Sequence, residues 1–89
     1  MPADIQAGFG AAVRARRKSL GISQEGLAER AALHRTYVAD VERGARNLSL
    51  GSIEKLAKAL DVSIESLFSD AAVAGPVAKR GRGGASGGE

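Results

Sequence analysis

The stretch ISQEGLAERAALHRTYVADVERG, from Ile22 to Gly44, decides the fold. Apolar residues recur in it at helical spacing in two blocks, residues 24–31 and 35–43, with about three residues between them. A chain of 89 residues is one domain at most, and it has few ways to use two short helices joined by so tight a turn. We therefore expect the rest of the chain to pack around this pair.

Four expected helix starts share one signature, an apolar residue on each side of the N-cap position, which is known as the hydrophobic staple. Serine is a preferred N-cap because its hydroxyl accepts a hydrogen bond from a free N–H of the first turn, and Ser23, Ser49 and Ser63 stand at three of the starts. His34 stands at the fourth start and is the weak cap. The staple pairs are Ile22 with Leu27, Leu33 with Val38, Leu48 with Ile53, and Val62 with Leu67.

These starts predict an all-α domain of five helices, at about 9–20, 24–31, 35–43, 50–60 and 64–69, and no segment has the pattern of a β-strand. We expect residues 1–8 to be a flexible lead, residues 9–70 to form the folded domain, and the Gly-rich basic residues 71–89 to be a flexible tail. The expected core consists of Val13, Leu20, Ile22, Leu27, Ala28, Leu33, Val38, Val41, Leu50, Ile53, Leu56, Ala57, Leu60, Val62 and Leu67.

The composition excludes several classes of site. The chain has no cysteine and one histidine, so we expect no disulfide, no zinc or other metal, and no cofactor. We expect no enzyme, because His34 looks exposed and no paired carboxylates share a plausible pocket. No apolar run approaches a membrane span and the N-terminus lacks a signal-peptide pattern. We therefore expect a cytoplasmic, nucleoid-associated protein without membrane or small-molecule partners.

The charge is unevenly distributed along the chain, whose net charge is +3. Residues 9–46 carry eight basic and four acidic side chains, whereas residues 47–70 carry two basic and four acidic ones. This asymmetry favours a protein with one anion-facing side. Solvated helix faces without a partner are the alternative, and charge alone does not separate the two.

The second helix of the central pair carries the chemistry for reading DNA. If Val38 and Val41 face inward, Arg35 and Thr36 are exposed in the first turn, where a helix docked in the major groove meets base edges. The Arg35 guanidinium matches guanine O6 and N7, and Thr36 offers a hydroxyl and a methyl group. Tyr37 either packs against the preceding helix or contacts DNA. We therefore predict a helix-turn-helix that binds double-stranded DNA.

Phosphate contacts are expected around this helix. The helix that begins at Gln24 presents free N–H groups and a partial positive charge, and the Gln24 side chain is placed to bridge a phosphate and the second helix. The loop after the second helix places Arg46 and Asn47 near the DNA backbone or a groove. Ser52, in the first turn of the following helix, is a further candidate.

One arginine is expected to be structural. Arg17 lies on the inward-leaning side of its helix, and Glu42 follows the core residue Val41. We predict an ion pair between Arg17 and Glu42 that ties the first helix to the third. The other basic residues of the first helix, expected to be solvated or to reach distant phosphates, are Arg14, Arg16 and Lys18.

Residues 9–69 resemble the lambda-repressor-like, XRE-type helix-turn-helix domains. The segment 23–62 is similar to the controller proteins of restriction–modification systems, above all in HRTY, ERGARN and SL. This resemblance implies a small homodimeric transcription regulator that binds palindromic operators and governs its own gene and the endonuclease gene. It also implies the RNA polymerase sigma subunit as a further partner. A phage-type repressor or a toxin–antitoxin regulator of the same fold is the alternative, and an RNA-binding or coactivator role stays open.

The resemblance also assigns roles by matching positions. It places Arg17 and Glu42 at the buried ion pair of the family. The family usually has glycine where Ala32 stands, which implies a left-handed backbone there and makes Ala32→Gly a stabilising change. The implied base contacts are Arg35, Thr36, Tyr37 and Arg46, and the implied backbone contacts are Gln24, Arg43, Asn47 and Ser52.

The last expected helix, residues 64–69, is a candidate dimer interface. Ile64 and Phe68 lie four residues apart on one helix face, and a core of this size leaves such a face uncovered. We predict a two-fold interface formed by Ile64, Leu67 and Phe68, with ordinary core as the alternative. Such a dimer places two recognition helices about one DNA turn apart, ~34 Å.

Overall fold

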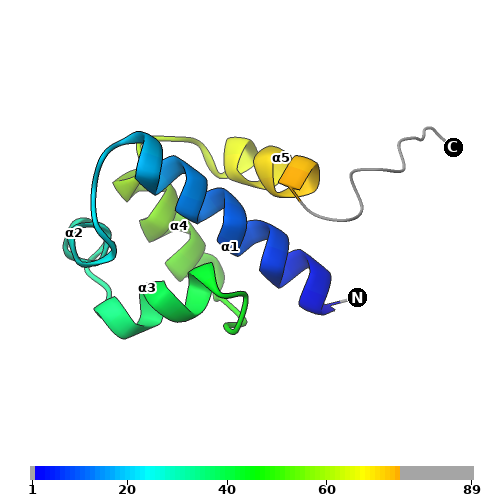
Figure 1. The fold of residues 1–89 in the computed structure, drawn as a ribbon, viewed down its shortest axis with the longest axis horizontal. Coiled ribbons are helices and arrows are strands. Elements are labelled where there is room, and N and C mark those ends of the chain that lie inside the picture. The colour runs from blue at the N-terminus through cyan, green and yellow to red at the C-terminus, as the bar shows by residue number, and fades with distance from the viewer. Residues whose placement is uncertain (1, 75–89) are drawn as a thin grey trace, which may run out of the picture.

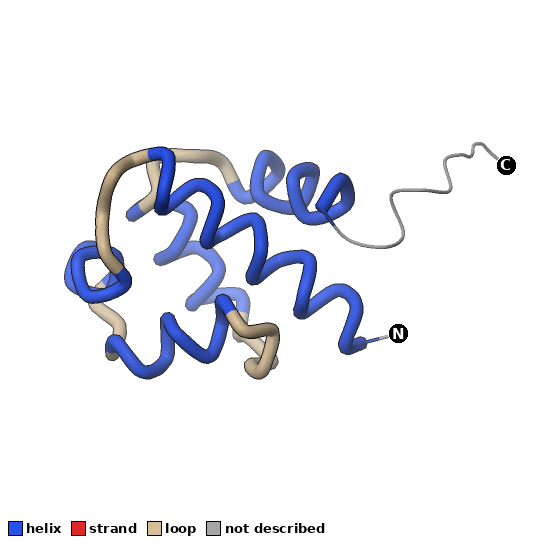
Figure 2. Tube along the Cα trace, in the orientation of Figure 1, coloured by secondary structure: helices blue, strands red, loops and turns tan. Residues whose placement is uncertain are grey.

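The computed structural model describes residues 2–74, which form five α-helices and no strand. The helices are α1 (Pro2–Ser19), α2 (Gln24–Ala31), α3 (Arg35–Glu42), α4 (Leu50–Ala59) and α5 (Ile64–Ala74). In Figure 1, α1 runs across the middle of the molecule, with α5 along one side of it and α3 on the other. Figure 2 shows that short loops connect the helices. The prediction of an all-α, five-helix fold is confirmed.

The serine caps begin the helices as the sequence predicts. The Ser23 hydroxyl accepts a hydrogen bond from the Gly26 amide at 2.9 Å, and the Ser49 hydroxyl accepts one from the Ser52 amide at 3.1 Å. Ser63 caps α5 in the same way. His34 makes no capping hydrogen bond from its side chain, so it is the weak cap of the four. The starts of α2, α3, α4 and α5 therefore lie where the staples predict them.

The core is one cluster to which all five helices contribute. The second residue of each staple pair is buried, and the first packs against the cluster from its rim. Leu50 was expected inside and is 84% exposed, because it is the first residue of α4 and lies outside the cover of the neighbouring helices. Four buried hydrophobic residues were missing from the expected core: Phe9, Ala12, Ala31 and Ala59.

The N-terminal lead was predicted wrongly. Residues 2–8 are not an unstructured lead but the first two turns of α1, which starts at Pro2. Proline is favoured at the first helical position because its missing N–H would have no partner there. Gly8 and Gly10 have a weak helix propensity, so the sequence did not indicate a helix over residues 2–8. Both glycines are buried, and their packing outweighs this low propensity.

The C-terminal boundary also lies later than predicted. Helix α5 continues to Ala74, five residues beyond the expected end at residue 69. Residues 75–89, where a flexible basic tail was expected, lie outside the described residues. Within residues 2–74, no helix is both long and apolar enough for a membrane span.

Each of the first four helices, α1 to α4, is followed within two residues by a residue of positive φ. At Gly21, Gly44 and Asp61 the φ angles are 71°, 75° and 59°. Ala32 has φ 57° and ψ 44°, so the left-handed conformation implied for this turn is present. Its N–H bonds to the Glu29 carbonyl at 3.3 Å, and the following N–H bonds to the Ala28 carbonyl at 2.9 Å, which is the Schellman arrangement.

Replacing Ala32 by glycine is expected to stabilise the domain. A non-glycine residue in the left-handed region costs roughly 1–2 kcal/mol, and glycine occupies this region freely. We expect Ala32→Gly to raise the free energy of unfolding by up to about 1 kcal/mol, measured by urea denaturation. The matched control is Ala45→Gly in the exposed loop after α3, which lacks a positive φ and should gain nothing. A lower stability for Ala32→Gly than for the parent would contradict this account of the turn.

Candidate nucleic-acid interface

Helices α2 and α3 form a helix-turn-helix whose second helix presents its first turn to solvent. Val38 and Val41 are fully or almost fully buried, so they fix the face of α3 that packs on the core. Arg35 and Thr36 are exposed on the free side. The structure therefore places these two side chains where the sequence predicts them, on a surface that a DNA groove can reach.

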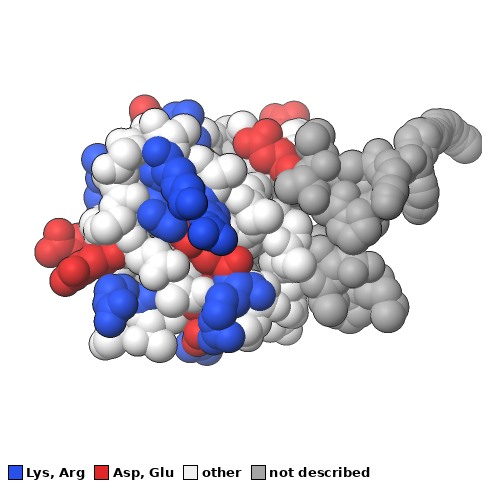
Figure 3. All heavy atoms as spheres, in the orientation of Figure 1, with Lys and Arg blue, Asp and Glu red and all other residues white. Residues whose placement is uncertain are grey.

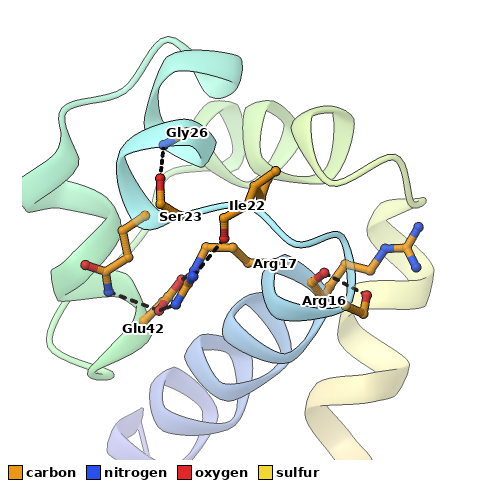
Figure 4. Close-up of polar contacts among 8 residues, drawn as sticks. Arg16, Arg17, Ile22, Ser23, Gly26 and Glu42 are labelled. Carbon is orange, nitrogen blue, oxygen red and sulfur yellow. Dashed lines mark hydrogen bonds and ion pairs between the residues drawn. The ribbon is translucent and has the colours of Figure 1, made fainter.

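A buried ion pair sets the position of α3 against α1, as predicted from the sequence (Figure 4). The Arg17 Nε donates to Glu42 Oε2 at 2.6 Å, and Arg17 Nη2 donates to Glu42 Oε1 at 3.0 Å. A third donor, Arg17 Nη1, bonds to the Ile22 carbonyl at 2.9 Å. The side chains of Arg17 and Glu42 are only 11% and 3% exposed. Arg17 thus links α1, the loop before α2, and α3.

The charges of this pair stabilise each other. The hydrogen bond to Glu42 raises the pKa of the Arg17 guanidinium above its ordinary value, against the opposing effect of burial. A guanidinium that donates two parallel bonds to one carboxylate combines charge with fixed geometry. The pair is therefore a structural element and is not free to contact a phosphate.

Gln24 connects this structural pair to the surface. Its side-chain Nε2 donates to Glu42 Oε1 at 3.1 Å, so the expected contact between Gln24 and α3 is present. An amide nitrogen carries two hydrogens, and the second one remains available as a donor. Gln24 is half-buried at the first position of α2, where the helix N-terminus attracts anions.

The end of α3 and the loop after it carry a cluster of four side chains. Asp40 pairs with Arg43, three residues later at the C-cap of α3, and its other oxygen lies 4.0 Å from Arg46 Nε. The Arg46 guanidinium lies over the Tyr37 ring, with its carbon 4.5 Å from the ring centroid. Tyr37 is half-buried and packs against the core, and its ring also supports Arg46. A contact of Tyr37 with DNA stays a prediction.

The two remaining candidates for phosphate contact lie near the start of α4. Asn47 is exposed in the loop. Ser52 is half-buried, and its hydroxyl accepts a bond from the Ser49 hydroxyl at 3.2 Å. Asn47 directly follows Arg46 in the chain, and Ser52 lies in the first turn of α4.

Two further arginines have structural roles that the sequence did not suggest. Arg16, expected to be solvated or to reach a distant phosphate, donates from Nε to the Leu60 carbonyl at 3.0 Å. Arg30 donates from Nη1 to the Ala59 carbonyl at 3.3 Å. Both side chains thus satisfy free carbonyls at the C-terminus of α4, where positive charge is favoured. The residue spacings of 44 and 29 leave no local pattern that could have predicted these contacts.

The surface charges are grouped on the face drawn in Figure 3. Lys and Arg side chains gather over α1 and near both ends of α3, while acidic side chains project beside α2. The exposed basic residues of these elements are Arg14, Lys18, Arg35, Arg43 and Arg46. Among residues 2–74, no three His, Cys, Asp or Glu side chains are grouped to hold a metal.

Helix α5 presents part of the predicted dimer surface. Ile64 and Phe68 are 42% and 38% exposed. Phe68 packs on Phe9 of α1, with ring centroids 5.2 Å apart. Leu67 is fully buried in the chain's own core, so its assignment to the interface is wrong. Ile5, 60% exposed and one turn before Phe9 on α1, was not identified from the sequence.

Comparisons with known proteins agree with this geometry. A family model described as helix-turn-helix matches residues 13–67. Control protein C.BamHI of Bacillus amyloliquefaciens is 49% identical over 69 residues, which cover 76% of this chain and 85% of that protein. Control protein C.SmaI of Serratia marcescens is 48% identical over 56 residues, which cover 63% of this chain and 67% of that protein.

A solved structure gives the same result. The restriction-modification controller protein C.AhdI of Aeromonas hydrophila superimposes with a TM-score of 0.68 at 48% identity, covering 70% of this chain and 94% of that chain. These relatives are named as control proteins rather than enzymes, in agreement with the expectation that this chain has no catalytic activity. The chain therefore belongs to the helix-turn-helix family of DNA-binding transcription regulators, and within it the chain is similar to the controller proteins of restriction–modification systems.

Proposed function

We propose that the protein is a sequence-specific regulator that binds palindromic operators as a homodimer and controls restriction–modification genes, including its own. The observation that carries the proposal is the exposed first turn of α3. Arg35 and Thr36 project from it, while Val38 and Val41 anchor its opposite face in the core. The similarity to C.BamHI and C.AhdI supports the genes proposed as targets.

Base reading falls to four side chains on α3 and the following loop. Arg35 and Thr36 reach base edges directly, with Arg35 suited to guanine. Arg46, stacked on Tyr37, is held close to the same surface and contacts a base from the loop. Tyr37 supports Arg46 and contributes the edge of its ring.

Positioning on the duplex falls to residues around these four, because phosphate contacts fix the register of a protein on DNA without reading sequence. Gln24 offers its second amide hydrogen at the start of α2. Arg43 and Asn47 are exposed beside the base-reading residues, and Ser52 lies in the first turn of α4. A contact with the RNA polymerase sigma subunit is a further expectation for an activator of this kind.

The proposed dimer is formed through α5. Ile64 and Phe68 are large exposed apolar residues of this helix, and Ile5 of α1 adds a third. A domain of about 70 residues is marginally stable alone, so burial of these side chains against a second copy stabilises both. The C2 arrangement that brings two equal faces together also presents the two α3 helices to a palindrome.

The dimer is tested by Ile64→Asp. A charge at this position faces its own copy in a two-fold interface, so we expect a monomer in sedimentation equilibrium at concentrations where the parent is a dimer. Operator affinity is expected to fall by roughly 100-fold or more, because the second half-site is no longer held in place. Leu50→Asp is the control for the sedimentation measurement, since Leu50 is more exposed than Ile64 but lies on α4, and this variant should remain a dimer. A parent that is monomeric at high micromolar concentration would refute this interface.

The function itself is tested by gel shift. The DNA upstream of the protein's own gene is compared with a scrambled duplex and with RNA of the same length. We expect binding to the upstream palindrome at a concentration that leaves the other two unbound. Equal binding to all three would overturn the proposal. Adjacent methyltransferase and endonuclease genes would support the controller assignment, and an adjacent toxin gene would favour the toxin–antitoxin alternative.

A further inference from the structure

The four-residue cluster of Tyr37, Asp40, Arg43 and Arg46, hereafter the Asp40 cluster, contains one carboxylate among the cations of the proposed interface. One Asp40 oxygen accepts a hydrogen bond from Arg43 Nη2, and the other lies 4.0 Å from Arg46 Nε. The Asp40 side chain is 23% exposed, and those of Arg43 and Arg46 are 66% and 46% exposed. Asp40 is thus partly covered by the two arginines that it pairs.

The cluster restrains Arg46 from two directions. Tyr37 and Asp40 lie three residues apart on α3, so they share a helix face. The Arg46 guanidinium lies over the ring of Tyr37, 4.5 Å from its centroid, and beside the carboxylate of Asp40. A loop arginine with these two neighbours is held in one orientation, whereas an unrestrained arginine samples many rotamers.

Asp40 has an electrostatic cost in DNA binding. Phosphates repel a carboxylate on the surface that meets them, and a phosphate must compete with Asp40 for Arg43 and Arg46. Binding to unspecific DNA depends almost wholly on phosphate contacts, whereas binding to an operator also includes base contacts. The carboxylate therefore weakens unspecific binding more than operator binding.

We propose that Asp40 is a positioning and specificity-determining residue. It orients Arg46 on Tyr37 for base contact. It also competes with phosphates for Arg43 and Arg46, which weakens binding to DNA that lacks the operator sequence. This inference rests on the proposed function, because it assigns a role in discriminating the operator from other DNA.

The test is Asp40→Asn, which keeps the side-chain size and removes the charge. We expect affinity for a scrambled duplex to rise about tenfold and affinity for the operator to rise less, so the ratio of the two falls. The slope of log affinity against log salt on the scrambled duplex is expected to steepen by about 0.9, the contribution of one more phosphate contact. An unchanged affinity ratio would overturn the proposal.

A second measurement needs no DNA. Tyr37 is the only tyrosine of the chain, which has no tryptophan, so intrinsic fluorescence reports on the Asp40 cluster. We expect acrylamide to quench Tyr37 emission more strongly in Asp40→Asn than in the parent, because Arg46 leaves the ring. Equal quenching in the two proteins would overturn the restraint on Arg46.

Two controls separate charge from structure. Asp40→Glu keeps the charge within reach of Arg43, so its unspecific affinity should stay near that of the parent. Glu65→Gln removes one charge from α5, which lies across α1 from α3 (Figure 1), and should leave the ratio unchanged. A ratio that falls equally in Glu65→Gln and Asp40→Asn would reduce the effect to net charge and overturn the proposal. A parent without operator preference would instead refute the proposed function, which the same assay reveals before any variant is compared.

Discussion

Arg17→Ala is expected to lower the free energy of unfolding by about 3–5 kcal/mol, the typical cost of removing one partner of a buried ion pair. The reason is the Glu42 carboxylate, which is 3% exposed and would keep only the Gln24 amide as a partner. The bond from Arg17 to the Ile22 carbonyl would be lost as well. For a domain of this size the thermal midpoint falls by more than about 12 °C, measured by circular dichroism.

The matched control is Arg14→Ala, which removes an exposed arginine from the same helix. We expect it to change stability by less than about 0.5 kcal/mol. The double variant Arg17→Met with Glu42→Leu removes both charges and should recover most of the loss, because an apolar pair leaves no buried charge unpaired. If Arg17→Ala melts like the parent and only DNA binding falls, Arg17 is a DNA contact and its structural assignment is wrong.

The second large effect is expected for Gly10→Ala, where α1 crosses α3. A Cβ built on Gly10 would lie 2.2 Å from the Val41 carbonyl oxygen and 3.0 Å from that of Glu42. Both are backbone atoms, so the two helices must move apart. Alanine would otherwise favour a helix by about 1 kcal/mol over glycine, but we expect a net loss of about 3 kcal/mol in chemical denaturation.

Gly51→Ala is the control for this crossing. A Cβ at Gly51 in α4 meets only the Ser49 hydroxyl, at 3.9 Å, which is an ordinary contact. The same change of residue type should therefore be neutral or stabilise by up to about 1 kcal/mol. If Gly10→Ala stabilises the domain as Gly51→Ala does, the close approach of α1 and α3 is incorrect.

The sequence predicts the middle of this fold better than its ends, for physical reasons. Ser23, Ser49 and Ser63 mark helix starts through local hydrogen bonds, which a sequence pattern records directly. The first turns of α1 were missed because Gly10 has a low helix propensity, and its use is a close contact with α3, 31 and more residues away in the chain. Leu50 has the spacing of a core residue, but no neighbouring element covers the start of α4.

In the candidate site too, features set by local spacing were predicted from the sequence, whereas contacts that depend on the path of a loop were not. The inward spacing of Val38 and Val41 is a local feature, and it was enough to predict which face of α3 is free. The ion pair of Arg17 with Glu42 was predicted because both residues stand beside core positions. The stacking of Arg46 on Tyr37 depends on the course of the loop after α3, which sequence spacing does not determine.

The most direct test of the central claim, that the first turn of α3 reads DNA sequence, is a comparison of Arg35→Ala with the parent. An operator is first selected from random duplexes with the parent protein, and the affinities of both proteins are then measured for it and for a scrambled duplex at one salt concentration. We predict that Arg35→Ala loses about 1–3 kcal/mol of operator binding and relaxes the preference at one base pair, while its affinity for the scrambled duplex changes little. An equal loss on both duplexes, or no loss on either, would contradict the claim.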